Sequence, residues 1–577
     1  VTSIIPYNIE NKPVETDAEL DVPRLQHNLD RVLFNPGVHV MRDPRSRVYN
    51  FDPEIAKIMP ASEFDYNALG EYITSSKDEK LRQLCVKYKK KYCGSTSSLS
   101  AILSHFHYLI SAWRKPNFGH LSRSTEPDSF NFTQMLRSPA AAFASFRNGS
   151  YAIDADKEYD EENLLASLGK SMEKHFLLPK EEFEKYRRTR SHEISEEQRN
   201  VGETYHYSEL GDFLVRSQLD AYDPRLPGSG VFDIKTRAVV SIRMDVQGYE
   251  KGLGYEISQL RGQWHSFERE YMDMIRAAFL KYSLQVRMGR MDGIFCAYHN
   301  TQRIFGYQYI PISEMDVAIH GTDNTRLGDE EFKASISMLN ALMDKGTQRW
   351  PGRTLRLHVE TRDTVIPLMY FFIEPVTDST MAKVQDANKS SLAATAAKVV
   401  EKIKGLQAKM GESAQEDSVT EQVPLDEKNE SIDETTDSGP AIDAVWDELM
   451  LKVEDVSPEN GTAMGTKAET VQEVKPKSTG KRELLGMVVT VKNKVDGSYT
   501  DRPNGDYKHW TVQYSIQELE DEKAWVVYRQ MKKRRSGVLS VDRAQRDSNW
   551  HSMWQGDLKK ATKEGKEMRE RLEKEDQ

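Results

Sequence analysis

The chain has few cysteines, no long apolar run and no excess of basic residues, and each shortage excludes a class of protein. Only three cysteines occur in 577 residues, at Cys85, Cys93 and Cys296, and they fit neither a disulfide framework nor a zinc site. The cysteine content therefore predicts a reducing, non-secretory compartment. No stretch approaches the roughly 18 consecutive apolar residues of a membrane span, so any membrane attachment would be peripheral. Because the sequence begins with Val1 rather than Met, it neither favours nor excludes an upstream targeting segment.

The acidity of the chain comes from one segment. The net charge is -10, and residues 377–480 contain 21 Asp or Glu and 11 Lys. This leaves 69 acidic and 69 basic residues elsewhere, out of 90 and 80 in the whole chain. The segment is also poor in aromatic residues and rich in Ser, Thr, Glu and Lys, which predicts disorder. Within it, only "AIDAVWDELMLKVE" is expected to form a helix.

The remaining chain is long enough for more than one domain. We expect an α/β (α+β) protein: an α/β core, a helical N-terminal region and an additional β-rich C-terminal module. A long disordered acidic insert interrupts that module, and its strands at 354–376 and 482–518 are predicted to form one sheet. The predicted boundaries are an extended and helical region at 1–150, the core at 151–315, the β-rich module at 316–376 plus 481–545, the insert at 377–480 and a charged C-terminal helix at 546–577.

A serine-rich start and strong apolar periodicity predict a helix at 97–114. Its apolar face would suit either the protein core or a membrane surface. A second, long helix is predicted at about 264–287, and two strands joined by an Asn-Thr-Gln turn follow it.

The segment "QLDAYDPRLPGSGVFDIKTR", at 218–237, places acidic and basic residues around a turn rich in Pro and Gly. The preceding residues, 213–222, predict one strand, and residues 230–244 predict a second one rich in Val and Ile. The two prolines and two glycines between them predict a tight connection. The segment is therefore predicted to be a β-hairpin.

Three charged residues of this hairpin are predicted to come together. Asp233 and Lys235 are two positions apart on one strand, so they point to the same face. Asp220 ends the preceding strand and can lie beside Asp233. Two converging carboxylates repel unless a cation lies between them, and oxygen ligands suit Mg²⁺ or Mn²⁺. The alternative is an ordinary surface hairpin with an Asp–Lys pair, which would contribute little.

A third acid is available on the helix predicted at about 161–178. In "ASLGKSMEKHFLL", Gly169 lies one turn before Glu173 on the same face. A glycine there would let a neighbouring backbone approach, and Glu173 would then stand at a crowded junction. In the alternative interpretation, Glu173 flanks the apolar stripe of the helix on its solvent side.

The end of the long helix offers a polar pair. Tyr282 and Gln285 are three positions apart, so they share a face. A glutamine amide both donates and accepts hydrogen bonds, which suits the positioning of a water or a phosphate oxygen. Ordinary packing at the end of a helix explains the pair equally well.

Together these motifs resemble the PD-(D/E)XK nuclease superfamily, particularly its RecB-like and phage-exonuclease branches. The superfamily has a glutamate in a GxxxE helix, an aspartate, a strand of the pattern hhDhKT and a YxxQ helix. Longer strings around the hairpin and the long helix are similar to a fungal mitochondrial RNA-processing family within that superfamily. The corresponding positions here are Gly169 and Glu173, Asp220, "VFDIKT" with Asp233 and Lys235, and Tyr282 with Gln285.

One departure from the superfamily pattern concerns the first aspartate. A proline normally precedes that aspartate, whereas here Pro224 follows Asp223. Asp223 therefore remains an alternative to Asp220 as the metal ligand.

The resemblance implies a metal-dependent phosphodiesterase. Glu173, Asp220 and Asp233 would hold Mg²⁺ or Mn²⁺, and Lys235 would orient or deprotonate the attacking water and offset charge on the phosphate. Gln285 would help to place the water or the phosphate.

Other residues of the same region are expected to contact the substrate. Arg237 and Arg216 are predicted to contact flanking phosphates, and Tyr282 is predicted to line the substrate site beside them.

The resemblance also implies a biological setting. It predicts a 5′-to-3′ exoribonuclease that processes and degrades mitochondrial transcripts, on the matrix side of the inner membrane, with a mitochondrial RNA polymerase as a further partner. Two alternatives are a non-catalytic RNA-binding or polymerase-associated factor on a nuclease fold, and a DNA-processing nuclease. The intact Asp-x-Lys motif and third acid favour an enzyme, whereas only the resemblance favours RNA, because no RNP-type or OB-type signal occurs.

Overall fold

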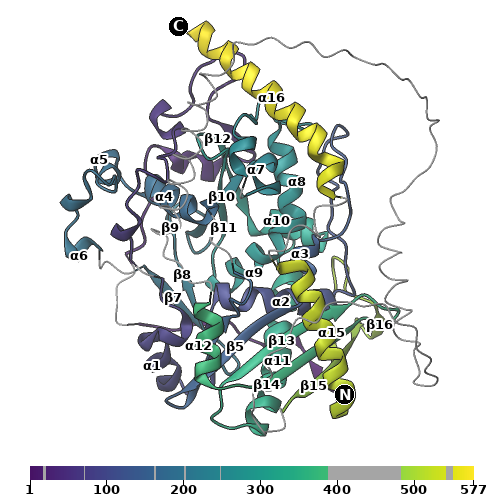
Figure 1. The fold of residues 1–577 in the computed structure, drawn as a ribbon. Helices are drawn as coiled ribbons and strands as arrows, with labels where there is room; N and C mark the ends of the chain where they lie inside the picture. The colour runs from purple at the N-terminus through teal and green to yellow at the C-terminus, as the bar shows by residue number, and fades with distance from the viewer. Residues whose placement is uncertain are drawn as a thin grey trace, which may run out of the picture. The chain divides into compact units, whose positions relative to one another are not determined.

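Two β-sheets form the framework of the molecule (Figure 1). The computed structural model describes residues 1–16, 21–70, 72–160, 164–199, 203–246, 248–387, 483–540 and 550–576. Within these ranges the fold is mixed α/β, as predicted. Because the strands come from many parts of the chain, the boundaries of independent domains stay a prediction.

The large sheet has twelve strands among the described residues. Its order is β1-β17-β15-β14-β13-β5-β6-β4-β8-β7-β2, and β16 pairs with β15. The strands are β1 (Thr2–Ile4), β2 (Lys12–Pro13), β4 (Tyr92–Ser95), β5 (Ala140–Arg147), β6 (Ser150–Ala155), β7 (Tyr205–Leu210), β8 (Phe213–Gln218), β13 (Leu355–Arg362), β14 (Leu368–Pro375), β15 (Leu485–Val495), β16 (Ser498–Thr500) and β17 (Trp510–Glu518).

The small sheet has the order β3-β12-β11-β10-β9. β10 and β11 run parallel, and the other neighbours are antiparallel. The strands are β3 (Val38–Val40), β9 (Ala221–Tyr222), β10 (Val231–Ala238), β11 (Gly293–His299) and β12 (Ile304–Pro311).

Helices surround both sheets and connect their strands (Figure 1). They are α1 (Glu79–Lys87), α2 (Thr96–Ile110), α3 (Gln134–Arg137), α4 (Leu164–Leu177), α5 (Lys180–Glu184), α6 (Glu196–Arg199), α7 (Val240–Met244), α8 (Phe267–Ala277), α9 (Phe279–Gly289), α10 (Ile312–His320), α11 (Arg326–Arg349), α12 (Asp378–Asp386), α15 (Asp521–Leu539) and α16 (Trp550–Asp576).

Helix α2 belongs to the protein core. It starts with a capping box between Ser95 and Ser98, in which the side-chain oxygen of each serine accepts a hydrogen bond from the backbone N–H of the other. Its side chains from Leu99 to Ile110 are buried, apart from Ala101. The predicted helix is therefore confirmed, and the alternative of a membrane-facing apolar stripe is wrong.

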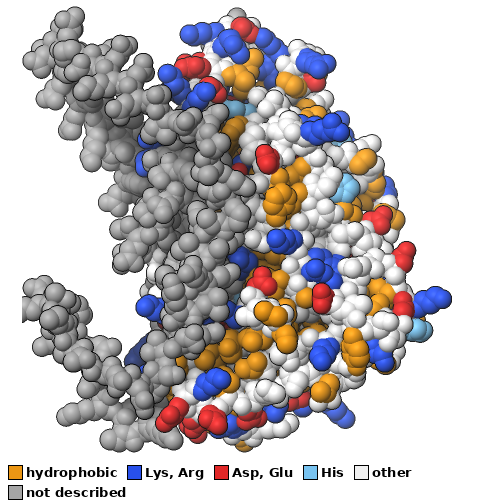
Figure 2. All heavy atoms as spheres, turned by 90° about the vertical axis from the view of Figure 1, so that its right-hand side faces the viewer, with side chains coloured by type: hydrophobic (Ala, Val, Ile, Leu, Met, Phe, Trp, Pro, Cys, Tyr) orange, Lys and Arg blue, Asp and Glu red, His pale blue; other side chains and the backbone are white. Residues whose placement is uncertain are grey.

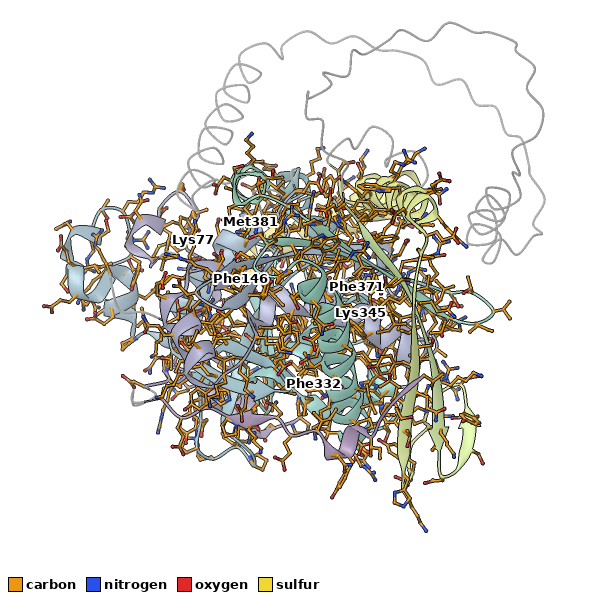
Figure 3. All side chains as sticks on the ribbon, turned by 90° about the horizontal axis from the view of Figure 1, so that it is seen from below. Lys77, Phe146, Phe332, Lys345, Phe371 and Met381 are labelled. Carbon is orange, nitrogen blue, oxygen red and sulfur yellow. The ribbon has the colours of Figure 1, made fainter. Side chains whose placement is uncertain are left out.

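Helix α11 is a long helix that the sequence analysis did not predict, although its buried residues recur at helical spacing. It packs against the large sheet at Gly346, where an added Cβ would lie 2.5 Å from the side chain of Ile373 on β14. A larger residue would force the side chain of Ile373 to shift, so glycine permits this close contact. Figure 3 shows α11 passing Phe371 of β14, with Lys345 and Phe332 along its length.

Two element predictions need correction. The long helix expected at 264–287 is two helices, because the backbone at Ala278 leaves helical geometry (φ -137°, ψ -36°). No Pro or Gly marks this break, so it arises from tertiary packing, with Tyr271 of α8 against Phe279 of α9. The second hairpin strand ends at Ala238, and residues 240–244 form α7 instead.

The strands on either side of the acidic insert pair directly. β14 and β15 are antiparallel neighbours, in register from Leu368 with Thr490 to Ile373 with Leu485. The predicted sheet across the insert is therefore observed. The start of the insert forms α12, but residues 388–482, including "AIDAVWDELMLKVE", lie outside the described residues, so their predicted disorder stays a prediction.

The described surface carries both signs of charge. Figure 2 shows Lys and Arg interspersed with Asp, Glu and apolar side chains on one face of the molecule. This agrees with the balance of acidic and basic residues outside the insert. Within the described ranges, no helix has both the length and the apolar character that crossing a bilayer requires. Cys85, Cys93 and Cys296 are buried free thiols.

Candidate active site

Asp220 lies where the chain passes from the large sheet to the small one. β8 belongs to the large sheet, and β9, which begins directly after Asp220, belongs to the small sheet. The Oδ2 atom of Asp220 accepts a hydrogen bond from the backbone N–H of Ile234 at 2.9 Å. Asp220 therefore lies against β10 beside Asp233, in the position that the hairpin pattern predicts.

Asp233 and Lys235 share one face of β10. The Lys235 ammonium forms an ion pair with the Asp233 carboxylate and lies 5.3 Å from the ring centre of Tyr282 on α9. Phe232 and Ile234, on the opposite face, are buried in the core. The alternation of the strand thus holds the reactive pair on a rigid, apolar support.

Glu173 reaches this region from α4. Its side chain is only 10% exposed and pairs with Lys170 Nζ at 3.0 Å, so the interpretation of Glu173 as a solvent-side residue is wrong. α4 crosses β10 near Gly169, where an added Cβ would lie 3.5 Å from the hydroxyl of Thr236. That is an ordinary contact distance, so the expected close backbone approach at Gly169 is not observed.

The acids and Lys235 influence each other's ionisation. Burial raises the pKa of Asp220 well above its ordinary value, and the charges of Asp233 and Glu173 raise it further. Burial would also raise the pKa of Asp233, but Lys235 and a hydrogen bond from Asp220 lower it. Burial opposes charge on Lys235, yet Asp233 and Asp220 raise its pKa. Asp220 therefore resists ionisation, whereas the neighbouring Lys235 favours the ionised form of Asp233.

The three acids are only partly converged. Among the described residues, the carboxylate oxygens of Glu173, Asp220 and Asp233 do not all lie within 4.8 Å of one another. Lys170 explains the spread, because its ammonium holds the Glu173 carboxylate. Lys170 is a site residue that the sequence reasoning missed. Its position three residues before Glu173 on the same helix was the available signal.

Asp223 is separated from this cluster. Arg225 binds its carboxylate through Nε at 2.9 Å and through Nη2 at 2.5 Å, and this hydrogen bonding lowers the pKa of Asp223. Asp223 and Arg225 line a pocket of 320 Å³ together with Arg24. The geometry therefore favours Asp220 over Asp223 as the acid that accompanies Asp233.

Arg216 has a different environment from the one predicted. It is 1% exposed, pairs with Asp78 and donates to the backbone carbonyl of Ile73 at 2.7 Å. Its guanidinium also lies 4.5 Å from the ring centre of Tyr205. These contacts hold Arg216 inside the protein, so the predicted contact with a flanking phosphate is wrong.

Arg237 continues the Asp233–Lys235 face of β10, but it is buried. Its Nε atom lies 3.9 Å from Glu270 of α8, and its Nε and Nη2 atoms have no hydrogen-bond partner among the described residues. Glu270 is bound more closely by Arg243 of α7, which also pairs with Asp273 at 2.7 Å. Arg237 is therefore buried against α8, and its predicted contact with a substrate phosphate stays a prediction.

Gln285 and Tyr282 lie on the α9 face that borders the cluster. Gln285 is half-buried, and its Oε1 atom has no hydrogen-bond partner among the described residues. Tyr282 packs over Lys235, as described above, and burial raises the pKa of Tyr282. The structure therefore brings Tyr282 of α9 to the acids and Lys235 of α4 and β10, whereas the role of Gln285 at the cluster stays a prediction.

Known proteins similar to this chain come from fungi. The profile of the family described as "Mitochondrial protein Pet127" matches residues 72–344. The "mRNA degradation protein pet127, mitochondrial" of Schizosaccharomyces pombe is 39% identical over 350 residues, covering 60% of this chain and 66% of that protein. The "Putative mitochondrial translation system component PET127" of Saccharomyces cerevisiae is 43% identical over 324 residues, covering 53% of this chain and 39% of that protein.

The matched regions span less than the full length of these relatives, about two thirds of one and two fifths of the other. Among solved structures, that of Candida albicans Rai1 in complex with pU5-Mn²⁺ is 10% identical in sequence, with a TM-score of 0.26. The alignment covers 67% of this chain and 99% of the Rai1 chain. That score is too low to support an argument about fold or chemistry. The sequence identities, in contrast, place the chain plainly: it belongs to the Pet127 family of mitochondrial proteins.

Proposed function

We propose that this protein is a divalent-metal-dependent ribonuclease of PD-(D/E)XK type that degrades and processes mitochondrial RNA, with 5′-to-3′ exonuclease polarity. The cluster of Asp220, Asp233, Lys235 and Glu173 supports the enzymatic part of this proposal. The description of the Schizosaccharomyces pombe relative as an mRNA degradation protein supports RNA as the substrate. The polarity, the inner-membrane location and a polymerase partner rest on the family resemblance alone.

The observation that carries the proposal is the burial of Glu173, Asp220 and Asp233 together with the ammonium of Lys235, which pairs with Asp233. Three buried acids at one sheet junction are unfavourable unless positive charge accompanies them. Lys235 and Lys170 supply that charge in the structure as it stands. The donor set consists of carboxylate oxygens, which Mg²⁺ and Mn²⁺ prefer. A bound divalent cation would polarise the scissile phosphate and lower the pKa of an attacking water.

Each residue would then have a defined task. Asp220 and Asp233 would hold the cation, and Glu173 would join them once it leaves Lys170. Because the pKa of Lys235 is raised, Lys235 is charged at neutral pH. That charge suits the offsetting of negative charge on the phosphate better than the removal of a proton from water.

Gln285 would position the nucleophile. Its Oε1 atom needs a hydrogen-bond donor, and a water molecule supplies one. Tyr282 would restrict the side chain of Lys235 by packing against it. Gln285 and Tyr282 can fill these two roles with the side-chain groups that they already have.

A cleavage assay tests the proposal against its alternatives. RNA and DNA oligonucleotides labelled at either end would be incubated with the purified chain, with Mg²⁺, with Mn²⁺ and with a chelator. The proposal expects metal-dependent digestion of RNA that proceeds from the 5′ end. RNA binding without cleavage would favour a non-catalytic factor, and preferential digestion of DNA would favour the DNA-processing alternative.

A further inference from the structure

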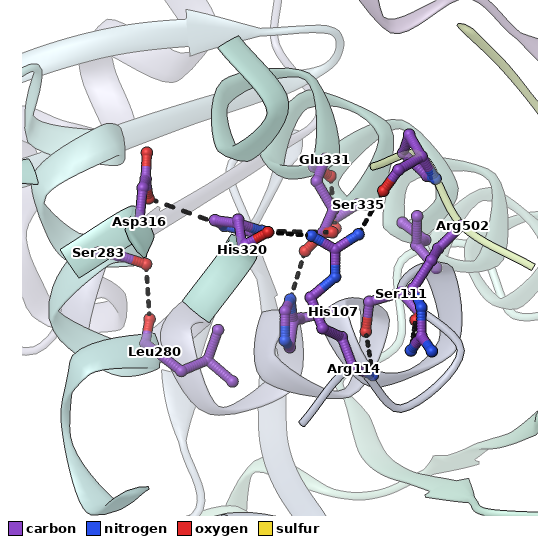
Figure 4. Close-up of polar contacts among 12 residues, drawn as sticks. His107, Ser111, Arg114, Leu280, Ser283, Asp316, His320, Glu331, Ser335 and Arg502 are labelled. Carbon is purple, nitrogen blue, oxygen red and sulfur yellow. Dashed lines mark hydrogen bonds and ion pairs between the residues drawn. The ribbon is translucent and has the colours of Figure 1, made fainter. Parts of the chain in front are cut away.

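A second cluster of metal-ligand side chains lies away from the carboxylate cluster. His107 of α2, His320 of α10 and Glu331 of α11 each offer one ligand atom, and these atoms all lie within 4.8 Å of one another. Figure 4 shows the three side chains turned toward one another from three separate helices. All three are buried, with exposures of 2%, 6% and 4%. Tertiary packing, rather than local sequence, therefore assembles this cluster.

Glu331 is the centre of the arrangement. One of its carboxylate oxygens is hydrogen-bonded to His107 Nδ1, and the other lies 3.8 Å from His320 Nδ1. On the far side of its ring, His320 Nε2 lies 3.8 Å from Asp316 Oδ1. Both imidazoles thus direct a nitrogen toward the same carboxylate.

The cluster is incompletely satisfied by hydrogen bonds. His320 Nδ1, His107 Nε2 and Asp316 Oδ1 are buried and have no hydrogen-bond partner among the described residues. Buried polar atoms are normally paired, and each exception calls for a reason. His320 Nδ1 lies 3.8 Å from Glu331 and makes no hydrogen bond among the described residues, so it is a buried nitrogen that a metal ion would satisfy.

We propose that His107, His320 and Glu331 hold a zinc ion that fastens α2, α10 and α11 together. Two imidazole nitrogens and one carboxylate oxygen are a donor set that zinc accepts, whereas Mg²⁺ and Ca²⁺ prefer oxygen ligands throughout. Ferrous iron accepts the same set in sites that keep positions open for substrate. A zinc ion on these three ligands would take a water as its fourth ligand, and the burial of all three side chains would shield that position from bulk solvent.

The surrounding charges are compatible with a cation. Arg287 lies beside the cluster, but Asp316 binds it at 2.5 Å and Asp329 binds it at 2.9 Å. Arg114 donates to backbone carbonyls, including that of His320. Asp316 also lies behind His320, where a carboxylate commonly orients a metal-bound imidazole.

The position of the cluster suggests what the ion would do. α10 follows β12 of the small sheet directly, whereas α2 and α11 pack against the large sheet. α9, which carries Gln285, is tied to the same place through Arg287. The ion would therefore link a helix that follows the small sheet to helices that pack against the large sheet.

Metal analysis of the purified full-length chain tests this proposal. After dialysis against a mild chelator, elemental analysis should find about one zinc per chain in the wild type. The variants His107→Gln and His320→Gln should each lose most of it. His105→Gln is the matched control, because His105 lies on the same helix, is equally buried and bonds to the carbonyl of Ser138 instead. The control should keep its zinc.

A second measurement uses the wild-type protein, so it tests the proposal even if the variants fail to fold. X-ray absorption at the zinc edge of the wild type should show nitrogen and oxygen ligands, including imidazole, and no sulfur. Wild-type protein that binds no transition metal after reconstitution would overturn the proposal. So would a His107→Gln/His320→Gln double variant that keeps its zinc. Iron with the same dependence on both histidines would support the site and overturn its assignment to zinc.

Discussion

At the scale of single residues, Lys235 has the fixed position and partial exposure expected of a lysine that stabilises negative charge during catalysis. It is confined between the Asp233 carboxylate and the ring of Tyr282, and its side chain is 21% exposed. Confinement of this kind keeps the ammonium at one place relative to the cluster, at little further entropic cost. A freely moving surface lysine would not have this property.

Lys235→Ala should therefore reduce turnover by roughly 100-fold or more, the usual effect of losing a group that stabilises the transition state. RNA affinity should change little, because other basic groups still contact the phosphates. Single-turnover cleavage and equilibrium RNA binding would measure the two quantities separately. Lys174→Ala, on α4, is the control and should behave like the wild type. An equal loss of affinity and rate would show that Lys235 only clamps the phosphate.

Asp220 makes the metal-free protein sensitive to pH. Because its folded-state pKa is raised, it stabilises the fold below the ordinary carboxyl pKa, and that stability is lost as pH rises through the raised value. A bound divalent cation favours the ionised form, so binding should release up to about one proton per site. Calorimetric titration of Mn²⁺ in buffers of different ionisation enthalpy would measure this release. Asp220→Asn should abolish it, and undiminished release from that variant would contradict the assignment.

At the scale of elements, the sequence predicts the hairpin better than its surroundings. The alternation in "VFDIKT" predicts the strand, its core face and the Asp233–Lys235 face, because a strand has a strict period of two. The crossing between sheets at Asp220 and the break at Ala278 were not predictable in this way, because no Pro or Gly marks the break and the strand pattern does not show to which sheet a strand belongs. The helix α11 was not predicted, although its apolar residues recur at helical spacing.

The residues of the candidate site also divide into those that a local motif indicates and those whose role depends on the fold. Local motifs indicate Glu173, Asp233, Lys235 and Gln285, whereas the partners of Arg216 lie more than 100 residues away in the sequence. An arginine bound to Asp78 and one bound to a phosphate look alike in a sequence. Only the fold distinguishes them.

The ion pair between Lys170 and Glu173 within α4 leads to a prediction about metal affinity. Lys170 competes with a cation for Glu173, so Lys170→Ala should strengthen Mn²⁺ binding, whereas Glu173→Gln should weaken it, each by roughly tenfold. Electron paramagnetic resonance titration of free Mn²⁺ would report both affinities. Lys174→Ala serves again as the control on the same helix. Equal affinities in all four proteins would exclude Glu173 from the metal site.

At the scale of the whole molecule, the large sheet joins distant parts of the chain. β1 from the N-terminus pairs with β17, and β13 pairs with β5. β14 and β15, on either side of the acidic insert, pair with each other. The framework around the candidate site therefore depends on pairings that do not involve the insert.

Replacing residues 390–480 with a short flexible linker should leave cleavage activity and thermal stability nearly unchanged. The replacement spares α12, whose Gln385 bonds to the backbone of Ala155 and Lys157. Closing a shorter loop between paired strands costs little entropy, and removal of acidic residues should tighten RNA binding slightly at low salt. Thermal melting and the cleavage assay would check both points. Unfolding or loss of cleavage would show that the insert has a structural or catalytic part.

The most direct test of the nuclease proposal compares Asp233→Asn with Asp223→Asn in the RNA cleavage assay. Both changes remove one carboxylate charge from the same hairpin, but only Asp233 belongs to the cluster with Asp220 and Lys235, whereas Asp223 is bound by Arg225. We expect Asp233→Asn to abolish metal-dependent cleavage while the fold and RNA binding remain, and Asp223→Asn to cleave at nearly the wild-type rate. Cleavage at the wild-type rate by Asp233→Asn would contradict the proposed metal site, and loss of cleavage only in Asp223→Asn would move that site to the other side of the hairpin.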